Sequence, residues 1–141
     1  MLNYDAQDGD AARRLAELAP TMRGSIAWLE YEAGMRSAQQ QRKPVMIVST
    51  TSSCPWCRKL DREVYTSAEV IALSQEFVCV KVDGGRRPGL ARTHRVGGYP
   101  TVLFLGPQGQ ELNRVRGYEP THAFLSDMRR ALGARAGIRL R

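Results

Sequence analysis

The chain has 141 residues, 43% of them hydrophobic and 25% charged, and its formal net charge is +7. These values are typical of one globular domain and exclude a wholly disordered chain. No apolar run is longer than that of Val45–Val48, which is far shorter than the roughly 20 residues that span a bilayer. A basic balance allows nucleic acid, a membrane surface or acidic proteins as partners, and it indicates nothing about the fold.

The first predicted element is a helix over Asp8–Ala19, within an N-terminal extension of residues 1–23. Its apolar residues share one face, and Pro20 ends it. A short strand is expected within Gly24–Leu29. Helical spacing then begins at Trp28 and ends before Pro44, with a core face formed by Trp28, Tyr31, Met35 and Ala38.

The central part of the chain alternates apolar strands with helices. Val45–Ser49 is apolar on both faces, as expected of a strand in a covered parallel sheet. The elements expected after it are a helix over Cys57–Tyr65, a helix capped by Thr66 or Ser67 and ending near Glu76, a strand over Phe77–Val82, a helical turn over Pro88–His94, and strands over Thr101–Leu105 and Glu111–Arg116.

A last helix is predicted from Pro120, because proline is tolerated in the first turn. From Gly133 onward we expect a basic tail, so the core covers residues 24–133 and the tail 134–141. Strands separated by helices imply parallel pairing, whereas the pair joined at Gln108-Gly109 is antiparallel. The predicted fold class is α/β, a single domain over residues 1–141 with a central mixed sheet flanked by helices.

The chemistry of the sequence is concentrated in Cys54-Pro55-Trp56-Cys57. The motif directly follows a buried strand and stands at the start of a helix. The free N–H groups and positive end of that helix favour a thiolate at Cys54. Cys57 lies one turn further, shielded and close enough to form a disulfide with it. One exposed nucleophile and one resolving partner are what thiol–disulfide exchange requires.

The alternative chemistry for such a pair is half of a zinc site. That site needs two more ligands, and only the scattered Cys79, His94 and His122 remain. A metal site is therefore disfavoured, and the exchange reaction needs no metal or organic cofactor. A vestigial motif in a redox-silent binding module is a further alternative.

The motif and its surroundings resemble the thioredoxin superfamily. The resemblance is carried by the strand before the motif, the helix after it, the strand ending in Asp83, and the segment Val96-Gly97-Gly98-Tyr99-Pro100-Thr101. With Trp28, Ala38 and Lys43-Pro44 ahead of the motif, the chain is most similar to a bacterial thioredoxin-like and disulfide-isomerase-like group, over about residues 28–132. The resemblance implies a thioredoxin fold and a protein-disulfide oxidoreductase, in a group that often acts in the bacterial envelope.

The resemblance also implies roles for the loop that contains Pro100. In the family this proline follows a cis peptide bond and packs against the active disulfide. Tyr99 would then lie beside the cysteines, with its backbone able to pair with a substrate strand. Trp56 is expected to be an exposed substrate contact, with packing on its helix as the alternative. Pro55 and Thr101 are expected to support the site.

Two positions depart from thioredoxins proper. Val48 stands where they carry a buried carboxylate, six residues before the first cysteine, and Pro55-Trp56 replaces Gly-Pro between the cysteines. Both differences argue against recycling by an ordinary thioredoxin reductase. Because a buried carboxylate would oppose a thiolate at Cys54, its loss predicts a more oxidising couple than that of thioredoxin.

Two further features have both a structural and a functional interpretation. Cys79 is flanked by valines and is predicted to be a buried core thiol, with a third redox thiol as the alternative. The arginines before Pro100 form either a solvated basic rim or a docking surface for acidic partners; they are Arg86, Arg87, Arg92 and Arg95.

The expected partners are protein disulfides or dithiols and an upstream redox partner. Nucleic acid is disfavoured because no recognised module or aromatic-interleaved basic stripe is present. Membrane insertion is not expected, and we expect a monomer. The N-terminal residues lack the apolar core of a signal peptide, which predicts a cytoplasmic protein for the chain as it stands. A trimmed mature form would belong in the bacterial periplasm or envelope.

Overall fold

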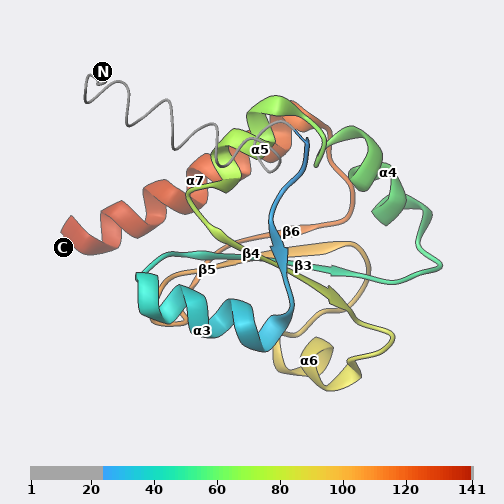
Figure 1. Cartoon of the computed structure of the whole chain (residues 1–141), viewed down its shortest axis with the longest axis horizontal. Coiled ribbons are helices and arrows are strands. Elements are labelled where there is room, and N and C mark those ends of the chain that lie inside the picture. The colour runs from blue at the N-terminus through green and yellow to red at the C-terminus, as the bar shows by residue number, and fades with distance from the viewer. Residues whose placement is uncertain (1–23, 141) are drawn as a thin grey trace.

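The computed structural model describes residues 24–140 and arranges them around a five-stranded sheet (Figure 1). The strands lie in the order β2-β4-β3-β5-β6. Both β2 and β3 are parallel to β4, whereas β5 is antiparallel to β3 and β6 is antiparallel to β5. The mixed sheet predicted from the sequence is confirmed. Its strands are β2 (Trp28–Leu29), β3 (Val45–Thr50), β4 (Val78–Asp83), β5 (Thr101–Leu105) and β6 (Glu111–Arg116).

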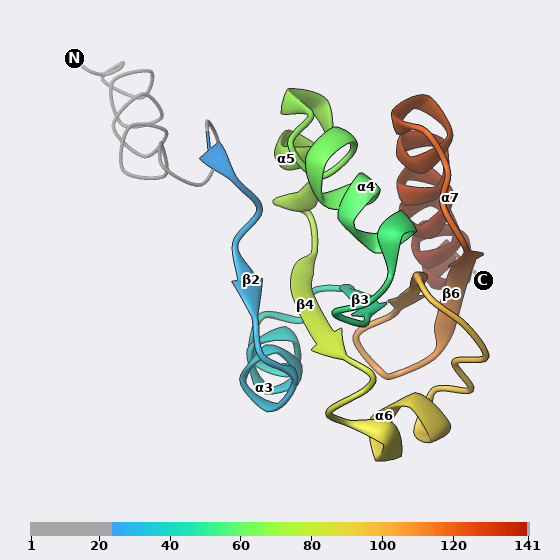
Figure 2. The ribbon, with the colours of Figure 1, turned by 90° about the vertical axis from the view of Figure 1, so that its right-hand side faces the viewer.

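Helices cover both faces of this sheet, as Figures 1 and 2 show. One face carries α3 (Tyr31–Gln41) and the short α6 (Pro88–Thr93), and the other carries α4 (Pro55–Glu63), α5 (Ala68–Ser74) and α7 (Thr121–Leu140). Because side chains alternate along a strand, the sheet divides the core in two. The larger half packs α4, α5 and α7 on Met46 and Phe104, and the smaller packs α3 on Ile47 and Val80.

The direction of β5 differs from the sequence prediction. It is antiparallel to β3 although α6 separates it from β4, whereas parallel pairing was expected for strands separated by helices. The six residues of α6 make a helix about 9 Å long, roughly half the length of the six-residue β4. Such a helix cannot carry the chain back along the sheet. Figure 2 shows α6 just beyond the end of β4, so β5 starts from that same edge.

The start of α3 also differs from the prediction. Trp28 lies in β2, where it pairs with Cys79, and α3 begins three residues later at Tyr31. The N-cap of α3 is Glu30, whose carboxylate accepts a hydrogen bond from the N–H of Ala33 at 2.8 Å. Trp28 consequently packs on the face of α4, α5 and α7, opposite to Tyr31.

The C-terminal helix is longer than expected. It continues through Gly133 to Leu140, where a frayed tail was predicted. A glycine costs only about 1 kcal/mol in a helix interior, and the alanines that follow at 134 and 136 are the strongest helix formers. The helix expected over Asp8–Ala19 and the extension of residues 1–23 lie outside the described residues. None of the helices within residues 24–140 is long and apolar enough to cross a bilayer.

Candidate active site

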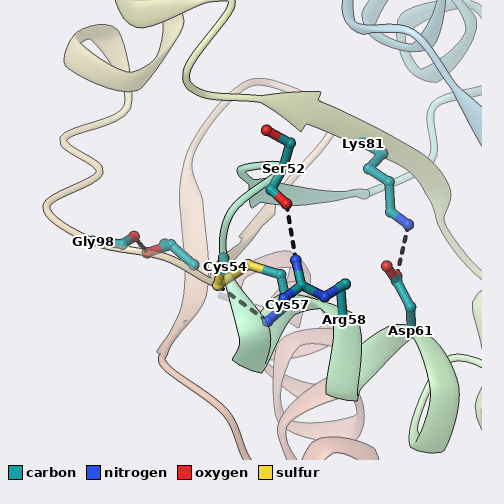
Figure 3. The surroundings of a disulfide bond; sticks show 8 residues. Ser52, Cys54, Cys57, Arg58, Asp61, Lys81 and Gly98 are labelled. Atoms are coloured by element: carbon teal, nitrogen blue, oxygen red, sulfur yellow. Dashed lines mark hydrogen bonds and ion pairs between the residues drawn. A yellow bond between two sulfur atoms is a disulfide. The ribbon is translucent and has the colours of Figure 1, made fainter.

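The two motif cysteines lie where β3 gives way to α4. Cys54 is the N-cap of α4, with extended backbone (φ −93°, ψ 107°), and its sulfur accepts a hydrogen bond from the N–H of Cys57 at 3.1 Å. Pro55 occupies the first turn, where its missing N–H costs no helical hydrogen bond. Cys54 and Cys57 form a disulfide, with their Cα atoms 5.3 Å apart (Figure 3). The helix therefore directs an N–H group at the first sulfur.

Access to the motif is uneven. Cys54 is 8% exposed and Cys57 is 4% exposed, so the first cysteine is the more accessible of two largely shielded residues. The sequence predicted an exposed nucleophile, whereas the disulfide and the surrounding loops shield most of Cys54. Trp56, between the two cysteines, is 54% exposed. The indole therefore presents exposed aromatic surface between the two shielded cysteines.

Two positive residues follow the motif within the first turns of α4. The guanidinium of Arg58 donates to the carbonyl of Ser52 at 2.9 Å and so fixes the loop before Cys54 (Figure 3). The ammonium of Lys59 lies 5.3 Å from the centroid of the Trp56 ring, within cation–π range. Neither cation has a carboxylate partner within residues 24–134.

The negative charge nearest to the motif along α4 is already balanced. The carboxylate of Asp61 is paired with the ammonium of Lys81 at 2.8 Å (Figure 3). Under α4, Val48 is 1% exposed and belongs to the larger half of the core. The side of the sheet that faces the cysteines thus presents an aliphatic side chain at this position.

The loop before β5 lies next to the cysteine motif because β5 runs antiparallel to β3. Ser49 pairs with Thr101, so the residue before β5 lies at the edge where β3 ends. The Tyr99–Pro100 peptide bond is cis, as predicted. The buried hydroxyl of Thr101 donates to the carbonyl of Gly98 at 2.7 Å, and the carbonyl of Pro100 accepts from the N–H of Gly117 at 2.8 Å. These two bonds hold the loop on both sides.

A groove runs along this loop. It consists of two adjoining hollows, of about 310 and 430 Å³, which share Tyr99, Pro100 and Gly117. Trp56 and Tyr118 complete the first hollow, and the second is completed by Gly97, Gly98, Thr101 and Arg116. We call the two hollows together the active-site groove. The structure thus brings together four of the residues predicted for the site: Trp56, Tyr99, Pro100 and Thr101.

Tyr118 lies beside Trp56 and was not among the residues predicted for the site. Their ring centroids are 5.5 Å apart, and the Lys59 ammonium is 4.9 Å from the centroid of the Tyr118 ring. The Tyr118 hydroxyl donates to Glu63 at 3.0 Å. No local pattern connects residues so far apart in sequence. The one available signal was Gly117, whose φ of +90° turns the chain back toward α4.

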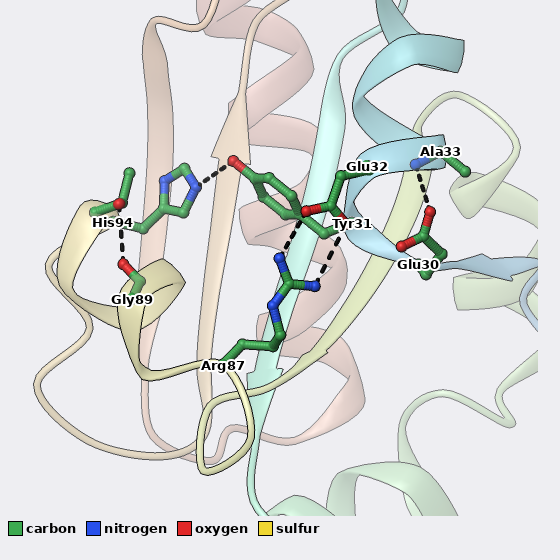
Figure 4. A network of polar contacts seen from close by, with 8 residues as sticks. Glu30, Tyr31, Glu32, Ala33, Arg87, Gly89 and His94 are labelled. Atoms are coloured by element: carbon green, nitrogen blue, oxygen red, sulfur yellow. Dashed lines mark hydrogen bonds and ion pairs between the residues drawn. The ribbon is translucent and has the colours of Figure 1, made fainter.

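A polar network on the opposite face holds the segment that leads into the groove (Figure 4). His94, at the end of α6, shares a 2.9 Å hydrogen bond with the hydroxyl of Tyr31. Burial lowers the pKa of His94 and raises the pKa of Tyr31. Two contacts of 2.6 and 3.3 Å join Arg87 to Glu32 and lower the pKa of Glu32 to about 2. The His94–Tyr31 hydrogen bond and the Arg87–Glu32 ion pair both attach the β4–β5 connection to α3.

The structure does not bring together the residues considered as metal ligands. Cys79 is buried in β4 toward α5, whereas His94 lies near α3 on the other face of the sheet. His122 is exposed at the start of α7. Within the described part of the chain, no group of three or more His, Cys, Asp or Glu residues could hold a metal ion.

Replacing Cys79 by alanine should leave thiol–disulfide exchange largely intact. Cys79 pairs with Met46 in β3, four residues and about 13 Å of strand before Thr50. Burial raises the pKa of its thiol to about 12, which disfavours the reactive thiolate. We expect Cys79→Ala to keep most activity and to lose about 1–2 kcal/mol of stability in denaturant unfolding. A loss of exchange with the fold intact would instead place this thiol in the electron relay.

Glu119 should make the stability of the protein depend on pH. Burial and the nearby carboxylate of Asp127 raise the pKa of Glu119 from 4.5 to about 7. A raised carboxyl pKa means that the folded state binds this proton more tightly than the unfolded chain. Stability is therefore lost as the pH rises from about 4.5 through 7.

The variant Glu119→Gln should raise the melting temperature at pH 8 by about 2 °C and have a smaller effect at pH 5. Glu76→Gln, a change of an exposed residue after α5, is the matched control. Equal shifts of Glu119→Gln at both pH values would contradict this account of the carboxyl pair.

Comparisons with known proteins agree with the geometry. A family model described as thioredoxin-like matches residues 27–107. The disulfide bond reductase DsbH of Chlamydia pneumoniae is 26% identical over 146 residues, which cover 89% of this chain and 87% of that protein. The thiol:disulfide interchange protein DsbD of Ralstonia nicotianae is 31% identical over 109 residues, and this chain covers 18% of its length.

A solved structure supports the same assignment. A thioredoxin from Thermus thermophilus has a TM-score of 0.71 and 30% sequence identity, covering 77% of this chain and 88% of that one. The chain therefore belongs to the thioredoxin-like family and has the thioredoxin fold that its sequence predicted.

Proposed function

We propose that this protein exchanges the Cys54–Cys57 disulfide with cysteines of protein substrates, with Cys54 as the attacking thiol. The observation that carries the proposal is the position of Cys54, an N-cap sulfur that accepts the Cys57 N–H and stands two residues before Trp56, which lines an open groove. The N–H group and the positive end of α4 stabilise a thiolate there. Relatives named as a disulfide bond reductase and a thiol:disulfide interchange protein support the same chemistry.

The reductive direction proceeds in two displacements. The Cys54 thiolate attacks one sulfur of the substrate disulfide, the substrate S–S bond breaks, and the departing thiolate takes up a proton. Cys57 then loses its proton and attacks Cys54, which releases the second substrate thiol and leaves the protein as a disulfide. Two electrons pass to the substrate, and a dithiol partner must return them. The same steps in reverse would oxidise a substrate dithiol.

The groove gives each lining residue a role in this exchange. Trp56 and Tyr118 offer aromatic surface next to the cysteines, on which an apolar part of a substrate can pack. Tyr99 and Pro100 form the opposite wall, with the Tyr99 backbone available to a substrate strand. Thr101 and Pro55 position this wall and the start of α4.

The redox couple should be more oxidising than that of thioredoxin. The helix N-terminus, Arg58 and Lys59 stabilise a thiolate at Cys54, Val48 contributes no opposing charge, and Asp61 is neutralised by Lys81. We expect a potential between roughly −270 and −120 mV when the protein is equilibrated in glutathione buffers. A value at or below about −270 mV would show that these charges do not set the potential.

A couple in this range suits an isomerase or a moderate reductant in an oxidising compartment. For a trimmed mature form, that compartment would be the bacterial periplasm or envelope.

The direct test of the proposal is reduction of insulin by the protein in the presence of dithiothreitol. Precipitation of the insulin B chain well before the dithiothreitol blank supports the exchange reaction, and Cys54→Ser provides the inactive control. A wild-type time course equal to the blank would contradict the proposal. It would favour a redox-silent module that uses the groove only for binding.

A further inference from the structure

The active-site groove differs in character between its two ends. At one end, Trp56 and Tyr118 form an aromatic wall, with the carboxylate of Glu63 bonded to the Tyr118 hydroxyl. At the other end the backbone of Gly97 and Gly98 lies beside Arg116. None of the described residues that line either hollow is Asp or Glu. The end of the groove at Arg116 thus carries a positive charge, and no acidic residue lines it.

Arg116 is placed there by the sheet. It is the last residue of β6 and pairs with Thr101, the residue directly after the cis proline. Its neighbour Val115 is buried, and alternation along the strand turns the Arg116 side chain outward to the groove, where it is exposed. Within residues 24–134, Arg116 forms no ion pair and no side-chain hydrogen bond. Its charge is therefore available to a ligand.

The neighbouring charges increase the positive potential at this end. Arg114 is fully engaged: its guanidinium binds Glu111 at 3.0 and 3.1 Å and donates to the carbonyls of His94 and Arg95. Arg114 first, with Arg116 and Arg95 contributing, lowers the pKa of Glu111. Glu111 is therefore engaged by Arg114, whereas Arg95 and Arg116 remain exposed.

Of the four arginines singled out from the sequence, Arg87 is held by Glu32 on α3. Arg86 and Arg92 are exposed and line neither hollow of the groove. Arg95 remains, at a left-handed backbone position (φ 56°) directly before the groove loop. Arg116 lines the groove, and Arg95 stands two residues before Gly97, the first lining residue of the loop; we call these two arginines the basic pair.

We propose that this pair binds an acidic side chain of the substrate, so that cysteines next to Asp or Glu are exchanged preferentially. The inference deepens the proposed function and rests on it. An aspartate at the Arg116 end gains a charge-assisted hydrogen bond, while the other flank of the cysteine packs on the aromatic wall. A lysine at the same place would meet only positive charge. Charge complementarity at an exposed site is screened by salt, so the preference should weaken as salt is added.

The test uses three synthetic peptides that differ only in the residues flanking one cysteine, which are Asp, Asn or Lys. The cysteine of each peptide carries a disulfide to 2-mercaptoethanol, a small neutral thiol. With dithiothreitol as reductant and the uncatalysed rate subtracted, kcat/KM for the Asp peptide should exceed that for the Asn peptide about three- to fivefold at low salt. The Lys peptide should be slowest, and the ratio should approach one at about 0.5 M salt.

The variant Arg116→Gln should reduce the Asp-to-Asn ratio toward one. Arg36→Gln removes the same charge from the exposed face of α3, far from the groove, and should leave the ratio unchanged. Equal turnover of all three peptides by the wild type would overturn this inference and leave the proposed function standing. An equal fall of the ratio in both variants would also overturn it, because net charge alone would then explain the preference.

A binding measurement separates this inference from the exchange chemistry. Calorimetry with the Cys54→Ser Cys57→Ser double variant reports peptide affinity without any reaction. Tighter binding of the Asp peptide, lost on further substitution of Arg116, supports the acidic site even if no peptide is turned over, a result that would contradict the proposed function alone. Equal affinity for all three peptides would overturn the inference.

Discussion

The variant Cys57→Ser should remain covalently joined to its substrates through Cys54. Without the second thiol, the mixed disulfide formed by the first displacement has no internal nucleophile to break it. Turnover of insulin should fall by at least about a hundredfold, since the two thiols act as a unit. Non-reducing electrophoresis and mass spectrometry should show an adduct that dithiothreitol removes.

The reciprocal variant Cys54→Ser is the control for this assignment. Cys57 is 4% exposed and lies one helical turn inside α4, so Cys54→Ser should form little adduct. Alkylation of the reduced wild type at mildly acidic pH should likewise label Cys54 first, because its thiolate is the stabilised one. Adducts that form through Cys57 at the wild-type rate would reverse the roles of the two residues.

Much of this redox centre could be predicted from the sequence because its determinants are local. The cysteine pair, the buried strand before it and the helix after it are contiguous, and each follows from burial pattern and capping rules. Thr101–Leu105 and Glu111–Arg116 are observed with the predicted bounds, since turn residues bracket both strands. The cis bond before Pro100 was implied by family resemblance, and local physics alone favours trans.

What the sequence could not provide depends on contacts between distant segments. The direction of β5 follows from how far α6 reaches, which no local periodicity records. The contact between Trp56 and Tyr118 arises only once β6 has been added to the sheet edge. The division of the arginines into engaged and free ones depends on where Glu32 and Glu111 fall in space. Charge pattern alone treats all of them alike.

The variant Phe124→Ala should cost about 3–5 kcal/mol of stability, a large fraction of the roughly 5–15 kcal/mol typical of a domain. Phe124 is fully buried in α7, with its ring 5.6 Å from that of Tyr65 and 6.4 Å from that of Phe104. Truncation removes both aromatic contacts and leaves a cavity between α7 and the sheet. Denaturant unfolding monitored by circular dichroism measures the loss.

Trp56→Ala is the matched aromatic control, because this ring is more than half exposed. It should change the unfolding free energy by less than about 1 kcal/mol while weakening exchange with protein substrates. Phe124→Ala should show the opposite pattern, with a near-normal redox potential below its melting temperature. A cost below about 1 kcal/mol for Phe124→Ala would mean that α7 is not packed as described.

Because β5 runs antiparallel to β3, residues 84–99 form a segment that could be replaced by another of different length or sequence. The segment leaves β4 and enters β5 at the same edge of the sheet. Its length and composition can therefore change while the register of the β3–β5 pair, in which Ser49 is opposite Thr101, stays the same. The cysteine pair depends on β3 and α4, which lie outside this segment. Evolution or design can therefore exchange this loop, together with the charge of Arg95, while Arg116 in β6 and the cysteine pair stay as they are. Proteins with this fold can therefore come to recognise different substrates while the cysteine pair that exchanges electrons is unchanged.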